Sequence, residues 1–484
     1  MIRWKYILHI LGALIACIGL SMLFPLGWST YYQDQGFRPL IESFLITTGV
    51  GGIVYLCFRN TGPSTVISHR EGMVITTLGW ALAGIFGGLP FYFSGVLPEP
   101  VDFVFETVSG FTTTGASVIK DVEIIPGGLL LWRSFTHWLG GLGIVVLGLA
   151  ILPFLGVGGM QLYKAEVPGP IVDKLKPRLK DTAMILWKVY LFLTVLETVL
   201  LHIGGMDLLD SLCHTFGTLG TGGFSTKNAS IGYYNSVYID TVVTVFMLIG
   251  GANFALHFQL VRGRPLVMWR DPEFRFYLAV FVGFWIVSAI NLYGPTYDSF
   301  GKALRYASFQ VASIMTTTGY ATADFEVWPG LAQLILVLCM FIGSSVGSTG
   351  GGMKCMRIIA LLKLAHSELI RLTHPRAVSR VKLGTQAISG DVLSSIWGFC
   401  ALWLGLLTVS ALAVAATGVD AVTSFTGCLA CIANVGPAFG ALGPMDNYAD
   451  LPQVAKWIMT LDMLLGRLEI YTVIILFFPR FYRK

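Results

Sequence analysis

The sequence predicts an all-α integral membrane protein with four span–pore helix–filter–span repeats around one pore, preceded by two extra transmembrane helices. Composition is the first reason: hydrophobic residues make up 55% of the 484 residues, charged residues make up 12%, and the mean hydropathy is +0.72. Such a chain crosses the membrane many times and is not a set of soluble domains. The second reason is a tripeptide ending in glycine that recurs four times, at intervals of about a hundred residues.

Ten apolar segments of roughly 20 residues are long enough to cross a bilayer. They are 6–25, 37–58, 72–93, 128–155, 182–203, 237–260, 275–293, 329–350, 394–417 and 454–478. The first of them is long for the apolar region of a signal peptide and is followed by no clear cleavage site, so we expect a retained span.

Four shorter apolar stretches alternate with the later spans. They are 101–111, 207–217, 301–314 and 420–432. Because stretches of about ten to fourteen residues cannot cross a bilayer, they are predicted to be re-entrant pore helices. Each repeat then crosses the membrane an even number of times, which places all four filters at the same face.

Each pore helix is followed by one of the recurring tripeptides, which we call the filter segments. They are Thr113-Thr114-Gly115, Gly220-Thr221-Gly222, Thr317-Thr318-Gly319 and Asn434-Val435-Gly436. Rings of backbone carbonyls replace the hydration shell of an ion in a potassium filter, and glycine permits the backbone geometry that this requires. Potassium is therefore expected at these residues as the substrate. No cofactor is expected on this chain, which lacks a dinucleotide-binding fingerprint.

This pattern divides the chain into five parts. Residues 1–70 hold two leading helices, 71–160 the first repeat, 161–265 the second with a cytoplasmic linker, 266–385 the third with a broken second span, and 386–484 the fourth.

Charged residues give the orientation. With the N-terminus inside, the segments predicted to face the cytoplasm hold most of the lysines and arginines, among them Arg262, Arg264 and Arg270. This bias places both termini in the cytoplasm. The opposite side is rich in acids, which are expected to concentrate cations at the pore mouth. These acids are Glu99, Asp102, Glu106, Asp121, Glu123, Asp207, Asp210, Asp298, Asp324, Glu326, Asp420, Asp446 and Asp450.

The eighth span is interrupted by a glycine-rich segment, 343–354. Its residues of interest are Gly343, Gly347, Ser348, Thr349, Gly350, Gly351, Gly352 and Lys354. Each glycine costs a helix about 1 kcal/mol relative to alanine. Irregular backbone inside a membrane is tolerated where it is buried in protein or faces a water-filled cavity. A flexible gate next to the cavity is therefore expected.

Arg467 lies inside the last predicted span, where a charge costs at least about 2.5 kcal/mol. Two interpretations are open. The arginine faces the pore and forms an electrostatic barrier below the filter, or it forms a structural ion pair with Asp462 or Glu469.

Other functional classes have less support in the sequence. The histidines are scattered singly and no nucleophile elbow or zinc-protease motif is present, so no enzyme is predicted. Cys428 and Cys431 are interpreted as small packing residues in a pore helix. The alternative to an ion pore is a proton- or sodium-coupled potassium symporter.

At the four filter glycines, the Gly-Ser-Thr-Gly-Gly-Gly loop and the Gly-Arg-Leu-Glu of the final span, the chain resembles the TrkH branch of the Trk/Ktr/HKT superfamily. The resemblance covers nearly the whole length. It implies potassium uptake across a bacterial inner membrane by a homodimer with one pore per subunit. It also implies a cytoplasmic TrkA-type ring that binds nucleotides and regulates opening; no nucleic acid partner is expected. By the same resemblance the broken span is a gating loop, Arg467 is the pore arginine, and Gly115 favours potassium over sodium.

Overall fold

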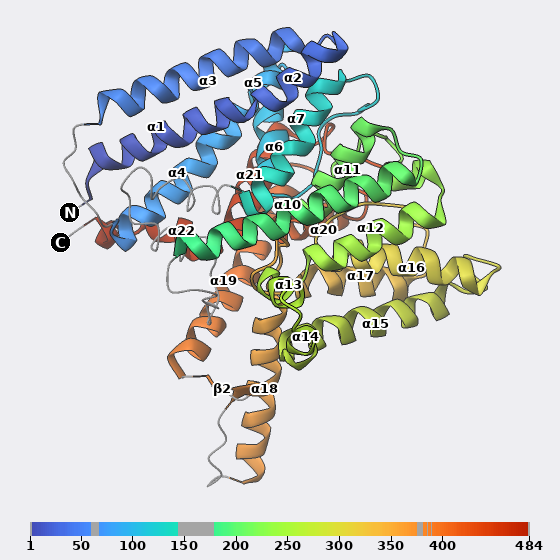
Figure 1. Cartoon of the computed structure of the whole chain (residues 1–484). Coiled ribbons are helices and arrows are strands. Elements are labelled where there is room, and N and C mark those ends of the chain that lie inside the picture. The colour runs from blue at the N-terminus through green and yellow to red at the C-terminus, as the bar shows by residue number, and fades with distance from the viewer. Residues whose placement is uncertain are drawn as a thin grey trace.

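The chain folds into a bundle of helices, shown as a computed structural model in Figure 1, which describes residues 2–59, 67–143, 179–374, 381–384, 386–388 and 390–482. Apart from one hairpin of two-residue strands, the regular elements in these ranges are helices, which confirms the all-α class. Six of them are long and apolar enough to cross a membrane, or seven if a bent pair is counted as one span. The six are Trp4–Tyr32, Phe37–Cys57, Arg70–Phe93, Met184–Ile203, Pro272–Leu292 and Gly390–Ala415.

The N-terminal helices lie along one side of the bundle. They are α1 (Trp4–Ser21), α2 (Leu23–Tyr32), α3 (Phe37–Cys57), α4 (His69–Gly87) and α5 (Leu89–Phe93). α1 and α3 run side by side in Figure 1 and meet at glycines: a Cβ added to Gly51 would lie under 3.0 Å from the backbone of Ala16. Small residues let helix backbones approach closely in lipid, which accounts for this packing.

From α4 onward the same arrangement occurs four times: a long helix, a short buried helix, a connecting segment and a second helix. The long helices are α4 with α5, α10 (Leu179–Ile203), α15 (Pro272–Leu292) and α19 (Gly390–Ala415). The short buried ones, the pore helices, are α6 (Pro100–Phe111), α11 (Leu208–Gly220), α16 (Phe300–Met315) and α20 (Ala421–Ile432). The second helices are α7 (Gly127–Trp138), α12 (Val237–Gly250), α17 (Gly330–Ile342) and α21 (Gln453–Arg467).

Acidic side chains begin two of the pore helices. The carboxylate of Asp207 accepts a hydrogen bond from the backbone N of Asp210 at 2.6 Å, and that of Asp420 accepts one from Thr423 at 3.0 Å. The hydrogen bonds from Thr423 hold the pKa of Asp420 below its usual value. These caps satisfy free N–H groups at one end of each helix, while the opposite, carbonyl end carries the negative end of the helix dipole into the protein.

The second helices are only 12 to 15 residues long, which corrects the prediction that 128–155, 237–260 and 454–478 are single spans, whereas the break in 329–350 was expected. The breaks are a π-helical turn at Leu139–Gly143, a 105° bend after α12, the segment 343–354 after α17, and positive φ angles at Glu469 and Ile470 after α21. Glycines at two breaks abut pore helices: a Cβ on Gly140 or Gly466 would lie under 3.0 Å from a carbonyl oxygen of α6 or α20. The part of 128–155 beyond residue 143 lies outside the described residues.

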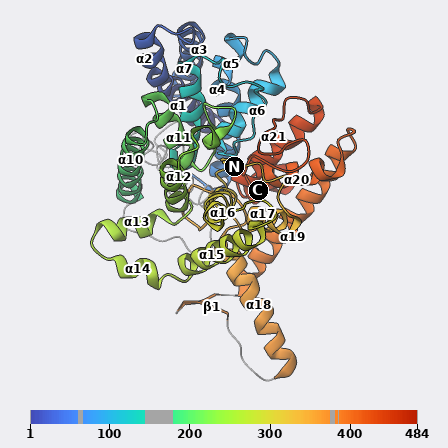
Figure 2. The same ribbon diagram turned by 90° about the vertical axis from the view of Figure 1, so that its right-hand side faces the viewer.

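The remaining elements are short or project from the bundle. They are α13 (Phe254–Val261), α14 (Pro265–Arg270), α18 (Cys355–Thr373), α22 (Tyr471–Ile474), β1 (Lys382–Leu383), β2 (Gln386–Ala387), and the 3-10 turns η2 (Ser230–Tyr234), η3 (Ile475–Phe477) and η4 (Pro479–Phe481). In the antiparallel hairpin Lys382 pairs with Ala387. Figure 2 shows α18 extending away from the body of the molecule.

Candidate functional site

The four pore helices end in the same way. Each is followed by a residue in the left-handed conformation: Thr113, Thr221, Thr317 and Asn434, with φ angles of 54°, 55°, 60° and 55°. The next backbone N–H then bonds the carbonyl five residues back, from Thr114 to Ser109, Gly222 to Gly217, Thr318 to Ser313 and Val435 to Ala430, at 2.8 to 2.9 Å. This is the Schellman geometry, which ends a helix and turns the chain sharply.

A glycine with positive φ follows each turn two residues later. These glycines are Gly115, Gly223, Gly319 and Gly436, with φ angles of 81°, 78°, 81° and 96°. The second filter segment is therefore Thr221-Gly222-Gly223, one residue later than the Gly220-Thr221-Gly222 expected from the sequence. Gly220 is instead the last residue of α11. Two consecutive glycines follow Thr221, and local sequence does not decide which of them corresponds to Gly115 in backbone geometry.

The four glycines close a ring in chain order. A Cβ added to any of them would lie under 3.0 Å from a carbonyl oxygen of the following repeat. The pairs are Gly115 with Gly222, Gly223 with Thr318, Gly319 with Val435, and Gly436 with Thr114. All four glycines also line one cavity. Close approach of backbone to backbone at these positions excludes any side chain, which is the physical reason for glycine here.

Hydroxyl and amide side chains form hydrogen bonds within the first and third repeats and between the fourth and first filter segments. The Thr112 and Thr114 hydroxyls lie 2.8 Å apart, as do those of Thr316 and Thr318 in the third repeat. Asn434 Nδ2 donates to Thr114 Oγ1 at 3.0 Å, which joins the fourth segment to the first. The asparagine thus accounts for the departure of the fourth segment from the Thr-Thr-Gly pattern.

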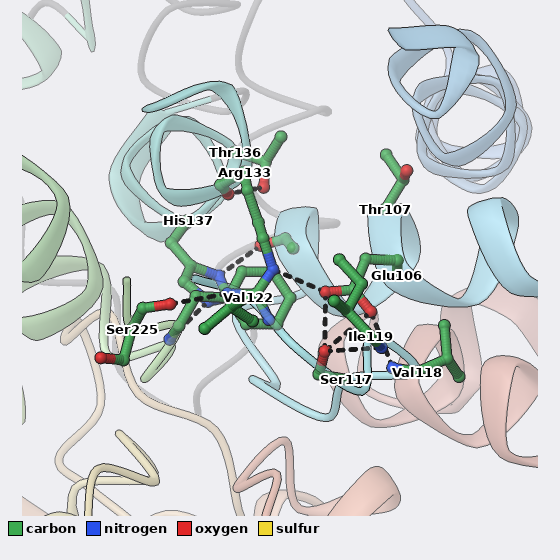
Figure 3. A network of polar contacts seen from close by, with 12 residues as sticks. Glu106, Thr107, Ser117, Val118, Ile119, Val122, Arg133, Thr136, His137 and Ser225 are labelled. Carbon is green, nitrogen blue, oxygen red and sulfur yellow. Dashed lines mark hydrogen bonds and ion pairs between the residues drawn. The ribbon is translucent and has the colours of Figure 1, made fainter. Parts of the chain in front are cut away.

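A buried ion pair supports the first and second filter segments (Figure 3). Arg133 of α7 and Glu106 of α6 are 3% and 1% exposed, and Nε lies 2.7 Å from Oε1. Glu106 also accepts from the backbone N of Val118 at 2.8 Å, and Arg133 donates to the carbonyl of Ser225 at 3.1 Å. Its guanidinium lies 3.5 Å from the ring centroid of Phe224. The ion pair therefore connects the backbone just after the first filter segment, at Val118, with the backbone just after the second, at Ser225.

His137 makes a second connection between the first two repeats (Figure 3). The backbone N of Phe224 donates to its Nε2 at 3.2 Å, so the hydrogen lies on Nδ1, which donates to the carbonyl of Gly110 at 2.8 Å. The imidazole is fully buried and touches Gly222. Sequence reasoning missed this role because the partners of His137 lie 27 and 87 residues away.

The cavity that the four ring glycines share with the residues following them does not have the acidic lining that the sequence predicted. Its lining residues include three bases, Lys120, Arg133 and Lys227, and one acid, Asp446. Several of the acids expected there are neutralised by bases: Asp450 by Lys120 at 2.6 Å, Asp210 by Lys227 at 3.3 Å, Asp102 by Lys456 at 2.7 Å, and Glu106 by Arg133. Attraction for a cation at this point therefore has to come mainly from backbone carbonyls and helix dipoles.

The glycine-rich segment 343–354 lies against three pore helices. Thr349 Oγ1 donates to the carbonyl of Leu219 in α11 at 2.9 Å, and the backbone N of Gly351 donates to Thr317 Oγ1 at 2.7 Å. A Cβ on Gly351 would lie under 3.0 Å from the carbonyl oxygen of Ala433, just after α20. The backbone N of Phe254 donates to the carbonyl of Gly347 at 3.0 Å, which anchors the segment to the bend after α12.

Arg467 joins this segment to the first repeat. It donates to the carbonyls of Thr349 at 2.7 Å, Gly140 at 2.6 Å and Gly141 at 3.1 Å. The two acids considered as partners are engaged elsewhere: Asp462 accepts from Ser410 at 2.7 Å, and Glu469 pairs with Arg357. The Arg467 guanidinium thus lies among backbone carbonyls of the first and third repeats.

Glu273 of α15 holds the glycine-rich segment at Val346 and the first turn of α18 at Met356, and it was not identified from the sequence. Its Oε1 accepts from the backbone N of Val346 at 2.8 Å and from that of Met356 at 3.1 Å, and the side chain is 4% exposed. A carboxylate after Asp271-Pro272 indicates only the start of a helix, because its partners lie 73 and 83 residues further along. Lys354 donates to the carbonyl of Gly350 within the segment.

Side chains suited to a metal centre do not gather in the described residues, where no group of three or more His, Cys, Asp or Glu is placed to hold an ion. Cys428 and Cys431 are free and buried, as the packing interpretation predicted. A ring of closely packed backbone with no such cluster is suited to a monovalent cation held by carbonyl oxygens.

Comparison with known proteins gives concordant matches. The family model described as "TrkH: Cation transport protein" matches residues 44–482. The Trk system potassium uptake protein TrkH of Halomonas elongata is 42% identical over 483 residues, which cover 99% of each chain. The protein of the same name in Escherichia coli strain K12 is 40% identical over 486 residues, covering both chains completely. The crystal structure of the potassium transporter TrkH from Vibrio parahaemolyticus superposes with a TM-score of 0.88 at 36% identity, covering both chains completely.

Proposed function

The chain belongs to the TrkH family of cation transport proteins, and on that premise we propose that it takes up potassium through one pore whose filter is the ring at Gly115, Gly223, Gly319 and Gly436. Members of this family are transporters, not enzymes. The observation that carries the proposal is the closure of the ring: each glycine abuts a carbonyl of the next repeat. Such a ring offers backbone oxygens in place of a hydration shell.

The proposed pore is assembled from four repeats, 71–160, 161–265, 266–385 and 386–484, after two leading helices in 1–70. The recurrence of long helix, pore helix, filter segment and interrupted second helix supports this division. Near two of the interruptions, Gly140 and Gly466 lie against the ends of pore helices α6 and α20.

Purified protein in liposomes tests the proposal. With opposed potassium and sodium gradients, the reversal potential is expected to follow potassium. An added pH gradient is expected to leave it unchanged. A reversal potential that follows sodium would contradict the filter, and one that moves with the pH gradient would favour the coupled symporter instead.

We propose the segment 343–354 and Arg467 as the gate beneath this filter. The segment lies against α11, α16 and α20 through Thr349, Gly350 and Gly351. Arg467 completes the fourth side, because it binds the carbonyl of Gly140, which itself abuts the end of α6. An ion that has passed the ring therefore meets this layer next, and opening requires the layer to move.

Replacing Glu273 by alanine is expected to raise basal potassium flux several-fold. The change leaves the buried N–H of Val346 without its acceptor, at a cost of about 1–3 kcal/mol, and removes the part-buried bond to Met356, so the observed arrangement of the gate is destabilised. Tracer flux per correctly assembled protein checks this. Glu273→Gln keeps an acceptor oxygen and serves as the control, with flux close to wild type. Equal flux in both variants and the wild type would show that Glu273 does not hold the gate.

Location and partners are also proposals. We infer a bacterial inner membrane protein with both termini in the cytoplasm. The basic segments support this orientation. The two termini lie close together in Figure 1, and Phe481 packs in one cluster with Tyr6 and Ile75. The curated relatives are named as parts of a Trk system, which implies further components. A homodimer and a TrkA-type cytoplasmic nucleotide-binding ring are the proposed assembly.

A further inference from the structure

Between the second and third repeats the chain forms two short helices at the edge of the molecule. α13 departs from α12 at an angle of 105°, and α14 follows it directly (Figure 2). α13 packs against α10, where the ring of Phe254 lies 5.8 Å from that of Tyr190, and the buried His257 bonds the carbonyl of Ile249 in α12. A helix that turns by about a right angle from a membrane-crossing direction lies along the membrane plane, in the position of an interfacial helix.

Large apolar side chains on these helices are left uncovered by the described part of the chain. Val261, Leu266 and Trp269 are 68%, 64% and 59% exposed, and Leu260 and Val267 are also exposed. Tryptophan favours the level of the lipid headgroups, with its ring toward the acyl chains and its N–H toward water. These residues therefore have the character of a surface that is immersed in the membrane interface.

Four arginines accompany these apolar side chains within fourteen residues: Arg262, Arg264, Arg270 and Arg275 are all exposed. In the described ranges, ion pairs with acids involve other arginines, namely Arg3, Arg38, Arg133, Arg305, Arg357 and Arg371. The same stretch holds two acids: Asp271, half-buried, caps α15 by accepting from Phe274 at 2.7 Å, and the buried Glu273 binds the proposed gate, so the four arginines outnumber the acids at the surface. The surface is thus positive.

We propose that α13, α14 and the first turn of α15 bind the headgroups of anionic phospholipids in the cytoplasmic leaflet. This rests on the orientation given under the proposed function. The planar guanidinium matches phosphate oxygens two at a time, and a cluster of four bases beside a span is typical of anionic-lipid contact. The exposed apolar side chains enter the acyl region beside the headgroups.

This surface is connected to the proposed gate through the chain. The stretch from Phe254 to Glu273 joins two anchors of the segment 343–354, the bond from Phe254 to Gly347 and the bond from Val346 to Glu273. Headgroups bound to α13 and α14 would hold the chain between these anchors in place.

Native mass spectrometry of the full chain tests the proposal without measuring ion flux, so its outcome is independent of the proposed pore. Protein in detergent is incubated with phosphatidylglycerol or phosphatidylcholine. The test variant carries Gln at the four arginines 262, 264, 270 and 275. The control variant loses the same charge at Lys5, Arg59, Lys382 and Arg480, which are exposed elsewhere. Bound phosphatidylglycerol is expected to fall about tenfold or more in the test variant and less than about twofold in the control.

Three results would overturn the proposal. Equal phosphatidylglycerol binding by wild type and the test variant would show that the surface holds no lipid. An equal loss in the control would trace the binding to net charge alone. Undiminished phosphatidylglycerol binding together with lost binding of a nucleotide-binding ring would assign the surface to a protein partner instead.

Discussion

Serine in place of Gly223 is expected to lower potassium-over-sodium discrimination about tenfold or more. The added side chain would begin under 3.0 Å from the carbonyl oxygen of Thr318, and the backbone at φ 78° is itself strained for serine. The ring therefore has to widen or tilt, and a change of about 1.4 kcal/mol between the two ions is enough for a tenfold effect. Flux ratios or reversal potentials in liposomes measure it.

Gly205→Ser is the matched control for backbone strain. Gly205 also has a positive φ, 100°, but a Cβ there would meet nothing within 4 Å. The Gly205→Ser variant should keep wild-type selectivity. If a Gly223→Ser protein assembles and discriminates potassium from sodium as well as this control does, the second segment is not part of the filter.

The second large effect is expected from Arg467→Ala, which should raise maximal potassium flux about tenfold without changing selectivity. The substitution removes a positive charge beneath the filter and frees the carbonyl of Thr349, and about 1.4 kcal/mol of lowered barrier suffices for that increase. Selectivity is decided in the ring above and should not move. Potassium and sodium flux per assembled protein checks both parts.

Arg467→Lys separates the two causes. Lysine keeps the charge but does not offer the planar set of donors that binds Thr349, Gly140 and Gly141 together. Low flux in the lysine variant would assign the barrier to charge, and high flux would assign it to the lost hydrogen bonds. Wild-type flux in a well-assembled Arg467→Ala protein would contradict both.

Several features of the site were predictable because their signals are local. The pore helices were placed within a few residues, since stretches such as 420–432 are apolar yet too short to span a bilayer. Three of the four positive-φ glycines that close the ring, Gly115, Gly319 and Gly436, were singled out from the sequence, and the glycine-rich segment was identified as a break in a helix. Each of these follows from composition or from backbone preference over a few neighbouring residues.

Other features depended on contacts between repeats and were missed or misplaced. Gly223 lies against the carbonyl of Thr318 and Gly222 against the imidazole of His137, and both contacts come from other repeats. The acidic mouth was expected from unpaired carboxylates, but partners such as Lys456 for Asp102 lie 354 residues away. The breaks after α7, α12 and α21 were missed; at two of them Gly140 and Gly466 meet the ends of pore helices, and hydrophobicity along the chain does not indicate such a contact.

The sequence by itself determined that this is an all-α membrane protein with four recurrent glycine-ended segments, because hydrophobic length and glycine placement are properties of single segments. Only the tertiary structure decided that the four glycines share one ring, that Arg467 binds carbonyls rather than Asp462 or Glu469, and that Glu273 holds the glycine-rich segment. The physical reason is that a buried polar group is satisfied by whichever partner the fold brings within hydrogen-bond distance, however remote that partner is along the chain.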